Sequence, residues 1–359
     1  MTQPKPSSVV VAMSGGVDSS LAAALLKEQG REVHGVHLLL PACGDAREQK
    51  LRAVERVAEH LGIPLGVVDL REHFMERVIR PFVAGYLAGR TPNPCVVCNP
   101  EVKFSSLRAW ADQHGAWFTA TGHYARVRRL EGGRWALFRG LDSKKEQSYF
   151  LHRLGQQDLE RALFPLGEFS KAETRSMAGS LGLPAASAPE SQEICFLAGQ
   201  DYRDFLSSRE SAAVSRGGDI VDSSGLKLGG HRGVFRYTIG QRRGLGIASD
   251  RPYYVIALRP ESGEVVVGRR EDLFSRWVEA ESFTWPSGRP NGGSLKAMAQ
   301  VRYRHEASPG RLEMIAAGRV RFVFDEAQPA VTPGQALVCY DGDRVMGGGW
   351  ITSAGKGLD

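Results

Sequence analysis

The sequence predicts an α/β protein: a doubly wound parallel sheet, followed by a small β-rich central domain and a C-terminal β-barrel. Three observations support this prediction. Up to about residue 121, short apolar runs alternate with segments of helical periodicity, as in the β-α repeats of parallel sheets. A turn rich in glycine and serine follows the first apolar run. After about residue 210, helical periodicity gives way to short runs between glycine-rich turns, which is typical of barrels and sandwiches.

In the first 121 residues, apolar spacing and stop residues define the element boundaries. Apolar side chains within 46–61 recur at helical spacing, and Gly62 and Pro64 then end that helix. Gly30 ends the preceding helix in the same way. In order along the chain, we expect strands over 8–13, 33–40, 65–70 and 117–121, and helices over 19–29, 46–61, 74–87 and 104–114.

Beyond residue 121 the pattern becomes less regular. A hairpin over 126–139 turns at a Glu-Gly-Gly sequence. Ser170 and Glu173 form a capping box that opens a helix, which stops near Gly182. Later strands are predicted over 233–238, 253–258, 265–268 and 319–325. These elements divide the chain into a first domain over 1–208, a central domain over 209–272 and a barrel over 273–359.

Length and composition are those of a globular protein with several domains. At about 150 residues per domain, 359 residues make two or three domains. A hydrophobic content of 42% and a charged content of 24% exclude a disordered or fibrous chain. The net charge of +6 suits a polyanionic partner. No apolar run approaches the ~18 residues of a membrane helix, and the first one lacks a signal-peptide pattern, so we expect a cytoplasmic protein with no membrane partner.

The turn Ser14–Ser20 has the chemistry of an anion-binding loop. Its glycines let the backbone approach an anion closely, and successive N–H groups form a nest. The helix that starts there adds the positive end of its dipole, and Ser14, Ser19 and Ser20 add hydroxyl donors. The turn is neither a Walker A loop nor a G-x-G-x-x-G motif. We therefore favour a phosphate site over a plain strand-to-helix turn.

This loop resembles the pyrophosphate-binding SGGxDS motif of the PP-loop ATPases, which cleave ATP to AMP and pyrophosphate and adenylate a substrate oxygen. The resemblance implies that Asp18 positions the pyrophosphate through Mg²⁺ or hydrogen bonds, because a carboxylate beside a triphosphate requires a cation. The nucleotide-binding residues that it implies are Ala12, Met13, Ser14, Gly15, Gly16, Val17, Asp18, Ser19, Leu38 and Gly122.

The five cysteines are too few for a disulfide scaffold in a chain of this length. Cys95 and Cys98 form a C-x-x-C motif, which fits a redox pair, half a zinc site or part of a cluster site. No second C-x-x-C or histidine pair completes a zinc site. Basic neighbours such as Lys103 favour a thiolate at Cys98, whereas Cys195 is equally consistent with a structural thiol. The remaining two, Cys43 and Cys339, are expected to be structural.

The chain as a whole resembles the tRNA-specific 2-thiouridylases, which thiolate the wobble uridine of certain tRNAs. The matching segments are spread over nearly the whole length, and several are long, so chance is a poor explanation. They are 13–20, 89–104 (GRTPNPCVVCNPEVKF), 120–124 (ATGHY), 140–150 (GLDSKKEQSYF), 191–196, 238–247 (TIGQRRGLGI), 302–304 and 332–335 (TPGQ).

This resemblance implies the roles of the thiols. Cys195 would carry a persulfide supplied by a sulfur-relay protein or a cysteine desulfurase. Cys98 would be the nucleophilic partner thiol, which closes a disulfide with Cys195 or releases the sulfur. Adenylation would make the uridine C2 oxygen a leaving group for the sulfur nucleophile. Family members often have Asp at the position of Cys95, where it acts as an acid or base near the thiols. Cys95 is therefore either a weaker base, or the acid/base role lies elsewhere. Family members also often have Met at the position of Leu38.

An iron–sulfur cluster is a minority hypothesis for the same three cysteines, because three thiolates can hold a cluster with one open iron. Cys95, Cys98 and Cys195 would then be its ligands. On this hypothesis the purified protein would contain iron and absorb visible light.

The resemblance also implies tRNA contacts, with tRNAs of the Lys, Glu and Gln type as expected substrates. Asn93, Pro94 and Cys95 would hold the target base, which must leave its stack. The other implied contacts are His123, Lys145, Glu146, Gln147, Arg302, Tyr303 and Gln335. If 302–304 is a strand, Arg302 and Tyr303 point to opposite faces.

Two basic clusters suit phosphate contacts, although either one is also consistent with a solvated basic face. The first lies within 126–145, where seven Lys and Arg residues accompany two acids. The second comprises Arg232, Arg236, Arg242 and Arg243.

The leading interpretation is an ATP-dependent tRNA sulfurtransferase. One alternative is a PP-loop amide ligase, which uses ammonia and needs no paired thiols. The other is a non-catalytic RNA-binding protein, which leaves the Ser14–Ser20 loop unexplained and would bind tRNA without cleaving ATP.

Overall fold

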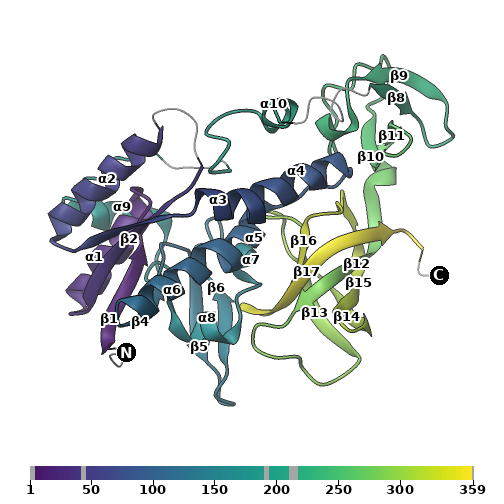
Figure 1. Ribbon diagram of the computed structural model, residues 1–359. Helices are drawn as coiled ribbons and strands as arrows, with labels where there is room; N and C mark the ends of the chain where they lie inside the picture. The colour runs from purple at the N-terminus through teal and green to yellow at the C-terminus, as the bar shows by residue number, and fades with distance from the viewer. Residues whose placement is uncertain (1–4, 42–45, 190–193, 210–216, 358–359) are drawn as a thin grey trace.

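The computed structural model describes residues 5–41, 46–189, 194–209 and 217–357. An α/β unit, a small β-rich unit and a barrel follow one another along the chain (Figure 1). The predicted fold class is confirmed. Within the described ranges, no helix has the length and apolarity needed to span a bilayer.

The N-terminal unit is built on a parallel sheet. Its first strand contains three consecutive valines, Val9–Val11, all fully buried, because helices cover both faces of the sheet. Every described pairing in this sheet is parallel. The strand order is β3 (Leu65–Asp69), β2 (Glu32–Leu39), β1 (Lys5–Ala12), β4 (Ala116–Ala120) and β7 (Ala162–Leu163). The short β7 was not predicted from the sequence.

Helices cover both faces of this sheet, as a doubly wound fold requires. One layer is formed by α1 (Val17–Glu28), α2 (Ala46–Leu61) and α9 (Lys171–Ser180), which share one apolar cluster with β1 (Figure 1). On the other face, α6 (Ser105–Gln113) packs on β1 and β2 through Leu107 and Ala111. The capping box at Ser170 and Glu173 opens α9 as predicted.

Two predicted helices are longer and less regular than their apolar spacing indicated. The segment predicted over 74–87 begins at Arg71 and contains a π-helical turn, Met75–Ile79, between α3 (Arg71–Phe74) and α4 (Arg80–Leu87). The helix predicted over 104–114 is preceded by α5 (Pro94–Cys98) and a π-helical segment, Asn99–Phe104. Such π segments occur frequently at functional sites, and the C-x-x-C motif lies on α5, directly before this one.

Three shorter helices complete the first unit and lead to the central one. They are α7 (Ser148–Leu151), α8 (Gln156–Arg161) and α10 (Tyr202–Ser207). The last lies beside α4, where Phe205 and Phe82 have ring centroids 6.4 Å apart. Phe235 of the central unit joins the same cluster, so this cluster links the first two units.

The central unit is a four-stranded sheet in the order β10 (Tyr254–Arg259), β11 (Glu264–Gly268), β8 (Gly218–Val221) and β9 (Lys227–His231). The strand predicted over 233–238 is wrong, because Val234–Arg236 forms a 3₁₀ turn. Gly233 precedes it with φ +134°, a left-handed conformation that favours glycine and turns the chain away from the sheet. An irregular loop, 238–253, then leads to β10.

The C-terminal unit is a closed barrel of six antiparallel strands. Val320, Phe322 and Phe324 alternate into its core as predicted, and Cys339 is buried there. In sheet order the strands are β12 (Phe274–Thr284), β15 (Arg319–Pro329), β14 (Ser308–Ala316), β13 (Ser294–Gln300), β16 (Ala336–Asp341) and β17 (Arg344–Gly355), and β17 pairs with β12 to close the barrel.

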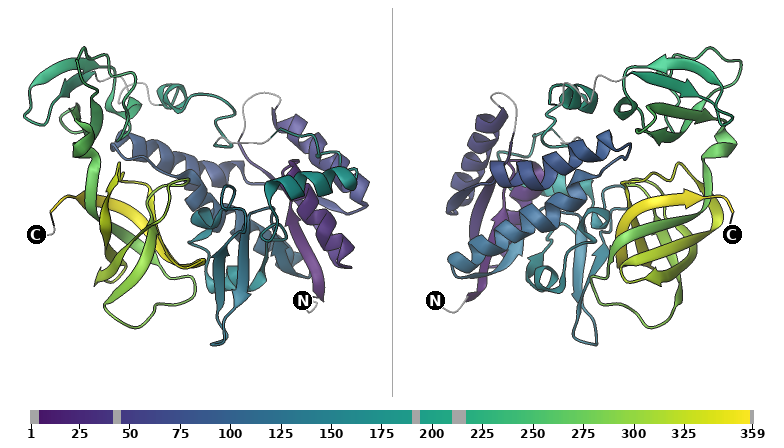
Figure 2. Two further views of the ribbon diagram at one scale, coloured as in Figure 1. Left: turned by 180° about the vertical axis from the view of Figure 1, so that it is seen from behind. Right: turned by 45° about the vertical axis from the view of Figure 1, so that its right-hand side comes forward.

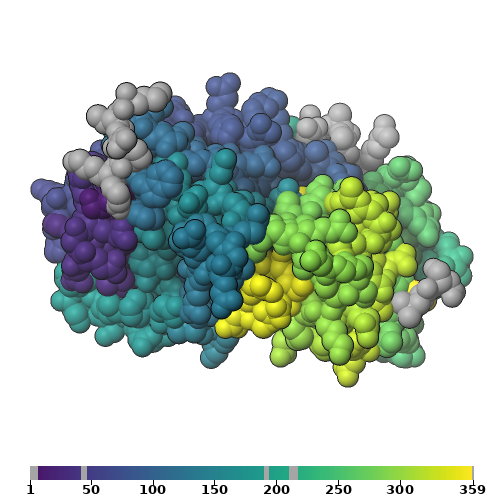
Figure 3. Space-filling view, turned by 90° about the horizontal axis from the view of Figure 1, so that it is seen from below, coloured from purple at the N-terminus to yellow at the C-terminus, as the bar shows by residue number. Residues whose placement is uncertain are grey.

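The predicted hairpin attaches the barrel to the first unit. It consists of β5 (Ala125–Arg129) and β6 (Trp135–Arg139), and Phe138 of β6 pairs with Arg344 of β17. The two units meet along this hairpin when the molecule is seen from below (Figure 3). The further views show the same contact, with the central unit above the barrel (Figure 2).

Candidate functional site

The phosphate loop lies at the carboxyl end of β1, between β1 and α1. In the strand order the chain moves from β1 to β2 on one side and reaches β4 on the other. The carboxyl ends of β1 and β4 therefore form the point where the strand order reverses, which is where open α/β sheets bind ligands. The helix α1 begins at Val17, two residues earlier than predicted.

Hydrogen bonds within the loop hold its serines in place. The Ser14 N–H donates to Ser19 Oγ at 3.1 Å, and Ser19 Oγ donates to the Gly16 carbonyl at 3.1 Å. Gly15 has φ +79°, and a Cβ there would lie 3.1 Å from that of Ala53, so conformation and space both require glycine. Among the described residues no side chain caps α1, which leaves its first N–H groups facing the turn.

Asp18 has a protein cation beside it. Lys171 Nζ, at the start of α9, lies 2.6 and 2.7 Å from the two carboxylate oxygens. The Tyr124 hydroxyl donates to one of those oxygens at 2.9 Å and lies 3.1 Å from Thr174 Oγ1. The family resemblance implied Mg²⁺ or hydrogen bonds at this carboxylate, and the contact in the structure is with the Lys171 ammonium. The local sequence around Lys171 indicates only a helix cap, so this contact was not predicted.

The turn after β4 lies directly against the phosphate loop. A Cβ on Gly122 would lie 2.7 Å from the backbone carbon of Asp18, so only glycine allows this approach. The Met13 N–H donates to the Val36 carbonyl, and the Met13 carbonyl accepts from His37 Nδ1 at 2.9 Å. These two hydrogen bonds fix the end of β1 next to β2. Leu38, near the end of β2, is partly buried. The assignment of Ala12, Met13, Leu38 and Gly122 to the nucleotide stays a prediction.

Two segments far apart in the sequence meet at the C-x-x-C helix. Asn93 caps α5 by accepting the Cys95 N–H at 3.2 Å, and Pro94 occupies the first helical turn. Cys98, at the end of α5, is buried in the same apolar cluster as Phe196. The ring centroid of Phe196 lies 5.2 Å from that of Phe82. This anchored phenylalanine holds the adjacent Cys195 at the surface of the cluster.

Burial dominates the acidity of the thiols. It raises the pKa of Cys98 to about 12 and that of Cys95 to about 11, and it also raises the pKa of Cys195. Negative charge on Cys195 would raise the pKa values of the other two further, whereas the positive charge of Lys103 lowers all three. Cys195 remains accessible to solvent. The thiolate is therefore the minor form of Cys95 and Cys98 near neutral pH in this arrangement.

The described cysteines are free thiols, namely Cys95, Cys98, Cys195 and Cys339. Cys43 and residues 191–193 of the resembling segment lie outside the described residues. Within the described part of the chain, no three His, Cys, Asp or Glu side chains are arranged to hold a metal ion. Cys95, Cys98 and Cys195 therefore do not fit an iron–sulfur cluster in this conformation.

Two lysines connect the thiols to the phosphate loop. Lys50 of α2 lowers the pKa of Cys195 through its charge, and its carbonyl oxygen lies 3.3 Å from the Cβ position of Gly15. The positive charge of Lys103 lowers the pKa values of the thiols and also that of His123. His123 directly follows Gly122, which lies against the backbone of Asp18. The helix α2, which packs against the loop, is therefore within electrostatic range of Cys195.

The barrel reaches the same region through its TPGQ turn. Gln335 is buried and donates from Nε2 to the Thr91 carbonyl at 2.7 Å, and Thr91 N–H donates to the Pro333 carbonyl at 2.9 Å. A Cβ on Gly334 would lie 2.9 Å from the Cβ of Arg90. The turn thus holds the loop that leads to Asn93, Pro94 and Cys95.

Residues 302–304 are not a strand, because the chain turns after β13. Arg304 has φ +64°, so the side chains do not alternate as in a strand. The Tyr303 ring centroid lies 4.2 Å from that of Phe150, and charge on Cys95 adds to the burial that raises the Tyr303 pKa. Arg302 donates to Thr332 Oγ1 at 3.2 Å. The turn therefore brings Tyr303 towards the thiols, which strand geometry did not predict.

The tripeptide Lys145-Glu146-Gln147 lies in a turn before α7. Glu146 is buried, with Arg139 at 3.1 Å from one carboxylate oxygen and the Ser148 hydroxyl at 2.6 Å from the other. Its carboxylate is therefore directed into the protein. The predicted contact of Glu146 with RNA would then be made by its backbone. Contacts of Lys145, Gln147 and His123 with tRNA stay predictions. Burial lowers the His123 pKa well below its ordinary value, and Thr121 Oγ1 lies 2.7 Å from its Nδ1.

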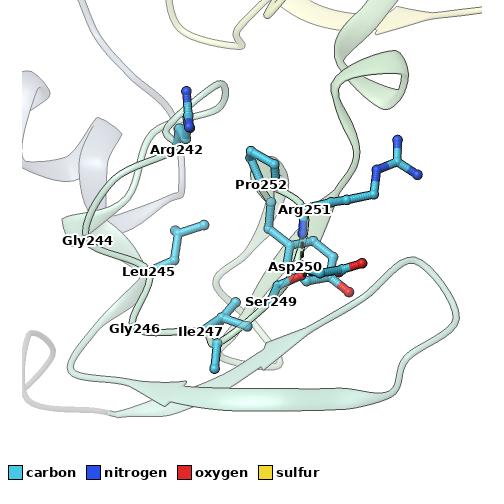
Figure 4. Close-up of a pocket in the computed structure, with 11 residues that line it drawn as sticks. Arg242, Gly244, Leu245, Gly246, Ile247, Ser249, Asp250, Arg251 and Pro252 are labelled. Atoms are coloured by element: carbon cyan, nitrogen blue, oxygen red, sulfur yellow. Dashed lines mark hydrogen bonds between the residues drawn. The ribbon is translucent and has the colours of Figure 1, made fainter.

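The two basic clusters differ. In the first, Arg126 is buried and lies 3.0 Å from Asp343, and Arg139 lies 3.6 Å from the ring centroid of Tyr340, so these arginines hold the hairpin to the barrel. In the second, Arg242 lies in a loop that lines a pocket of about 620 Å³. Arg242 and Arg251 lie on opposite sides of the lining residues (Figure 4). Phosphate contact at this second cluster stays a prediction.

Three family models match the chain. They are described as tRNA methyl transferase HUP domain over residues 7–199, tRNA methyl transferase PRC-barrel domain over 203–269 and aminomethyltransferase beta-barrel domain over 275–351. Together they span the three sheets of the fold.

Curated relatives are similar over nearly their whole length. The tRNA-specific 2-thiouridylase MnmA of Syntrophotalea carbinolica is 49% identical, with 96% of this chain and 98% of the relative covered. The protein of the same name from Geobacter metallireducens is 45% identical, with 99% of each chain covered. Among solved structures, a 4-thiouridine synthetase–RNA complex with bound ATP is 16% identical, with a TM-score of 0.35 over 58% of this chain and 51% of that chain.

Proposed function

The chain belongs to the tRNA-specific 2-thiouridylase family, and we propose that it places sulfur at C2 of the wobble uridine of tRNA. It is an ATP-dependent tRNA sulfurtransferase. The observation that best supports the chemistry is that thiols from two distant segments lie within electrostatic range of one another, with Cys98 and Phe196 in one apolar cluster, on the α/β unit that carries an anion-binding loop. An amide ligase needs no such thiols, and a non-catalytic RNA-binding protein needs no such loop.

In the first step, the uridine C2 oxygen attacks the α-phosphorus of ATP, and pyrophosphate leaves. We assign the pyrophosphate to the loop from Ser14 to Ser19, where N–H groups and hydroxyls face the turn. Mg²⁺ would neutralise charge on the phosphates. Both oxygens of Asp18 already contact Lys171, so we infer that Mg²⁺ enters with the triphosphate rather than on a preformed protein site.

In the second step, sulfur replaces the activated oxygen. The terminal sulfur of a Cys195 persulfide attacks C2 and AMP leaves, so the uridine is held to Cys195 through a disulfide. Cys195 is accessible, which suits loading by a sulfur-relay protein or a cysteine desulfurase. Lys103 and Lys50 favour negative charge at this position.

In the third step, Cys98 releases the product. Its thiolate attacks Sγ of Cys195, closes the Cys98–Cys195 disulfide and leaves the second sulfur on C2 as the thiocarbonyl. The two thiols are oxidised and the transferred sulfur is reduced, so an external thiol must reopen the disulfide. The burial that raises the Cys98 pKa has to be relieved or offset when tRNA and ATP bind, because only the thiolate attacks.

The remaining assignments follow the same division of the chain. We propose that residues 1–208 perform the thiolation, that 209–272 form the central domain and that 273–359 form the tRNA-contacting barrel. We assign the base to Asn93, Pro94 and Cys95, with tRNAs of the Lys, Glu and Gln type as substrates. The other proposed tRNA contacts are His123, Lys145, Glu146, Gln147, Arg302, Tyr303 and Gln335. We place this action in the cytoplasm.

Mass spectrometry of nucleosides tests the proposal. Unmodified tRNA is incubated with the enzyme, ATP, Mg²⁺, a reducing thiol, and a cysteine desulfurase with cysteine as the persulfide donor, and we expect 2-thiouridine together with AMP. Cys195→Ser should abolish 2-thiouridine and AMP release while tRNA-dependent pyrophosphate release survives, and Asp18→Asn should impair pyrophosphate release itself. Cys339→Ala, at a buried cysteine of the barrel, is the matched control. Thiolated tRNA from Cys195→Ser would remove the sulfur-carrier assignment.

The same assay separates the alternatives. A PP-loop amide ligase would keep its activity in Cys98→Ser and Cys195→Ser. A non-catalytic RNA-binding protein would bind tRNA but release no AMP.

A further inference from the structure

Asp18 of the phosphate loop is connected to the turn that contains Lys145, Glu146 and Gln147. The first connection runs through Tyr124. Its hydroxyl donates to Asp18 at 2.9 Å, and its backbone pairs with Gln147 in both directions. The Tyr124 N–H donates to Gln147 Oε1 at 3.1 Å, and the Gln147 N–H donates to the Tyr124 carbonyl at 2.8 Å. One residue thus contacts both the loop and the turn.

The second connection runs through Lys171. Its ammonium contacts both oxygens of Asp18, and its backbone N–H donates to Asp142 Oδ2 at 2.9 Å. Asp142 organises the turn, because its carbonyl accepts the N–H groups of Lys145 at 3.0 Å and Glu146 at 2.8 Å. The start of α9 therefore contacts the phosphate loop with a side chain and the turn with its backbone.

Both connections are buried and closely packed. Tyr124 is 2% exposed and Lys171 is 9% exposed. A Cβ on Gly140 would lie 2.8 Å from the Tyr124 carbonyl oxygen, and one on Gly122 would lie 2.7 Å from the Asp18 backbone. With so little free space, a displacement of the turn has to displace Asp18 or break a buried hydrogen bond, which is costly.

We propose that Tyr124 and Lys171 are positioning residues that link the two substrates: tRNA held at the 142–147 turn fixes Asp18 and thereby tightens ATP binding. This inference rests on the proposed function, because it takes that turn as a tRNA contact and the loop as the ATP site. When tRNA binds the turn, it restricts the positions of Asp18 and Lys171, so ATP then binds to a site that already has its final geometry. By reciprocity, ATP tightens tRNA binding by the same factor.

Calorimetry on the full chain tests the linkage. The probe is α,β-methylene-ATP with Mg²⁺, titrated in the absence and presence of a saturating unmodified tRNA transcript with a wobble uridine. For the wild type, we expect Kd for the analogue to fall about fivefold or more when tRNA is present. Tyr124→Phe removes only the hydroxyl that contacts Asp18, and it should bring this ratio close to one while tRNA binding alone is retained.

Lys171→Met provides a second arm, and its folding is checked by thermal denaturation. If it does not fold, Tyr124→Phe decides the question. Tyr237→Phe, at a buried tyrosine of the central unit, and Lys227→Met, at an exposed ion pair with Asp219, are matched controls that should keep the wild-type ratio.

The outcomes separate this inference from the proposed function. A wild-type ratio near one, or an unchanged ratio in Tyr124→Phe, overturns the linkage even if the same preparation makes 2-thiouridine. Absence of both 2-thiouridine and analogue binding in the wild type overturns the proposed function and this inference with it.

Discussion

Alkylation of individual cysteines tests the electrostatics of the thiol cluster. Burial raises the pKa of Cys98 from 9.0 to about 12, so its thiolate fraction near neutral pH falls about a thousandfold, since each pKa unit is a factor of ten. For Cys95, at about 11, the reduction is about a hundredfold. Because only the thiolate reacts, iodoacetamide at pH 7.5 should label Cys98 about a thousand times more slowly in the folded protein than in urea.

Peptide mass spectrometry of quenched samples gives the rate at each position. Cys195 is accessible and should react first of the three. Lys103→Met removes the charge that lowers the pKa of all three thiols, so it should slow their labelling further, whereas Lys227→Met serves as the control. Labelling of folded Cys98 within threefold of its rate in urea, or unchanged rates in Lys103→Met, would refute this account.

Three further predictions concern the surrounding structure. Arg139→Met leaves the buried Glu146 carboxylate without its cation and should lower the free energy of unfolding by about 3 kcal/mol in urea titrations; a loss under 0.5 kcal/mol would contradict it. Gly122→Ala should weaken binding of α,β-methylene-ATP at least tenfold, because the added methyl meets the Asp18 backbone; unchanged affinity would mean that the turn yields freely. Burial lowers the His152 pKa from 6.5 to about 4, so the unfolded chain binds this proton first and stability is lost as pH falls from about 6.5 towards 4. His152→Gln should flatten that loss in melts across this range, and an identical slope would exclude His152 as its source.

Parts of the fold could be read from local patterns because local interactions produce them. The capping box at Ser170 needs only residues three apart, and the alternation of Val320, Phe322 and Phe324 reports one buried strand face. The π-helical segment after Cys98 could not be read in this way, because packing against the rest of the protein shifts the helix register there. The turn at 302–304 could not be read from the sequence either, since Tyr303 packs on Phe150 rather than continuing β13.

The sequence by itself determined the fold class, the phosphate loop and the pair of thiols that the family resemblance singles out. The phosphate loop and the helix and strand patterns depend on neighbouring residues, whose spacing expresses helix, strand and turn preferences directly. The two thiols are far apart in the sequence, and only the family resemblance identifies them as a pair. Only the tertiary structure decided that Lys171, 153 positions from Asp18, supplies the cation for that carboxylate, and that Glu146 is directed inward. Such pairings depend on which elements the packing brings together, because an ion pair or a buried thiol is defined by neighbours in space and not along the chain.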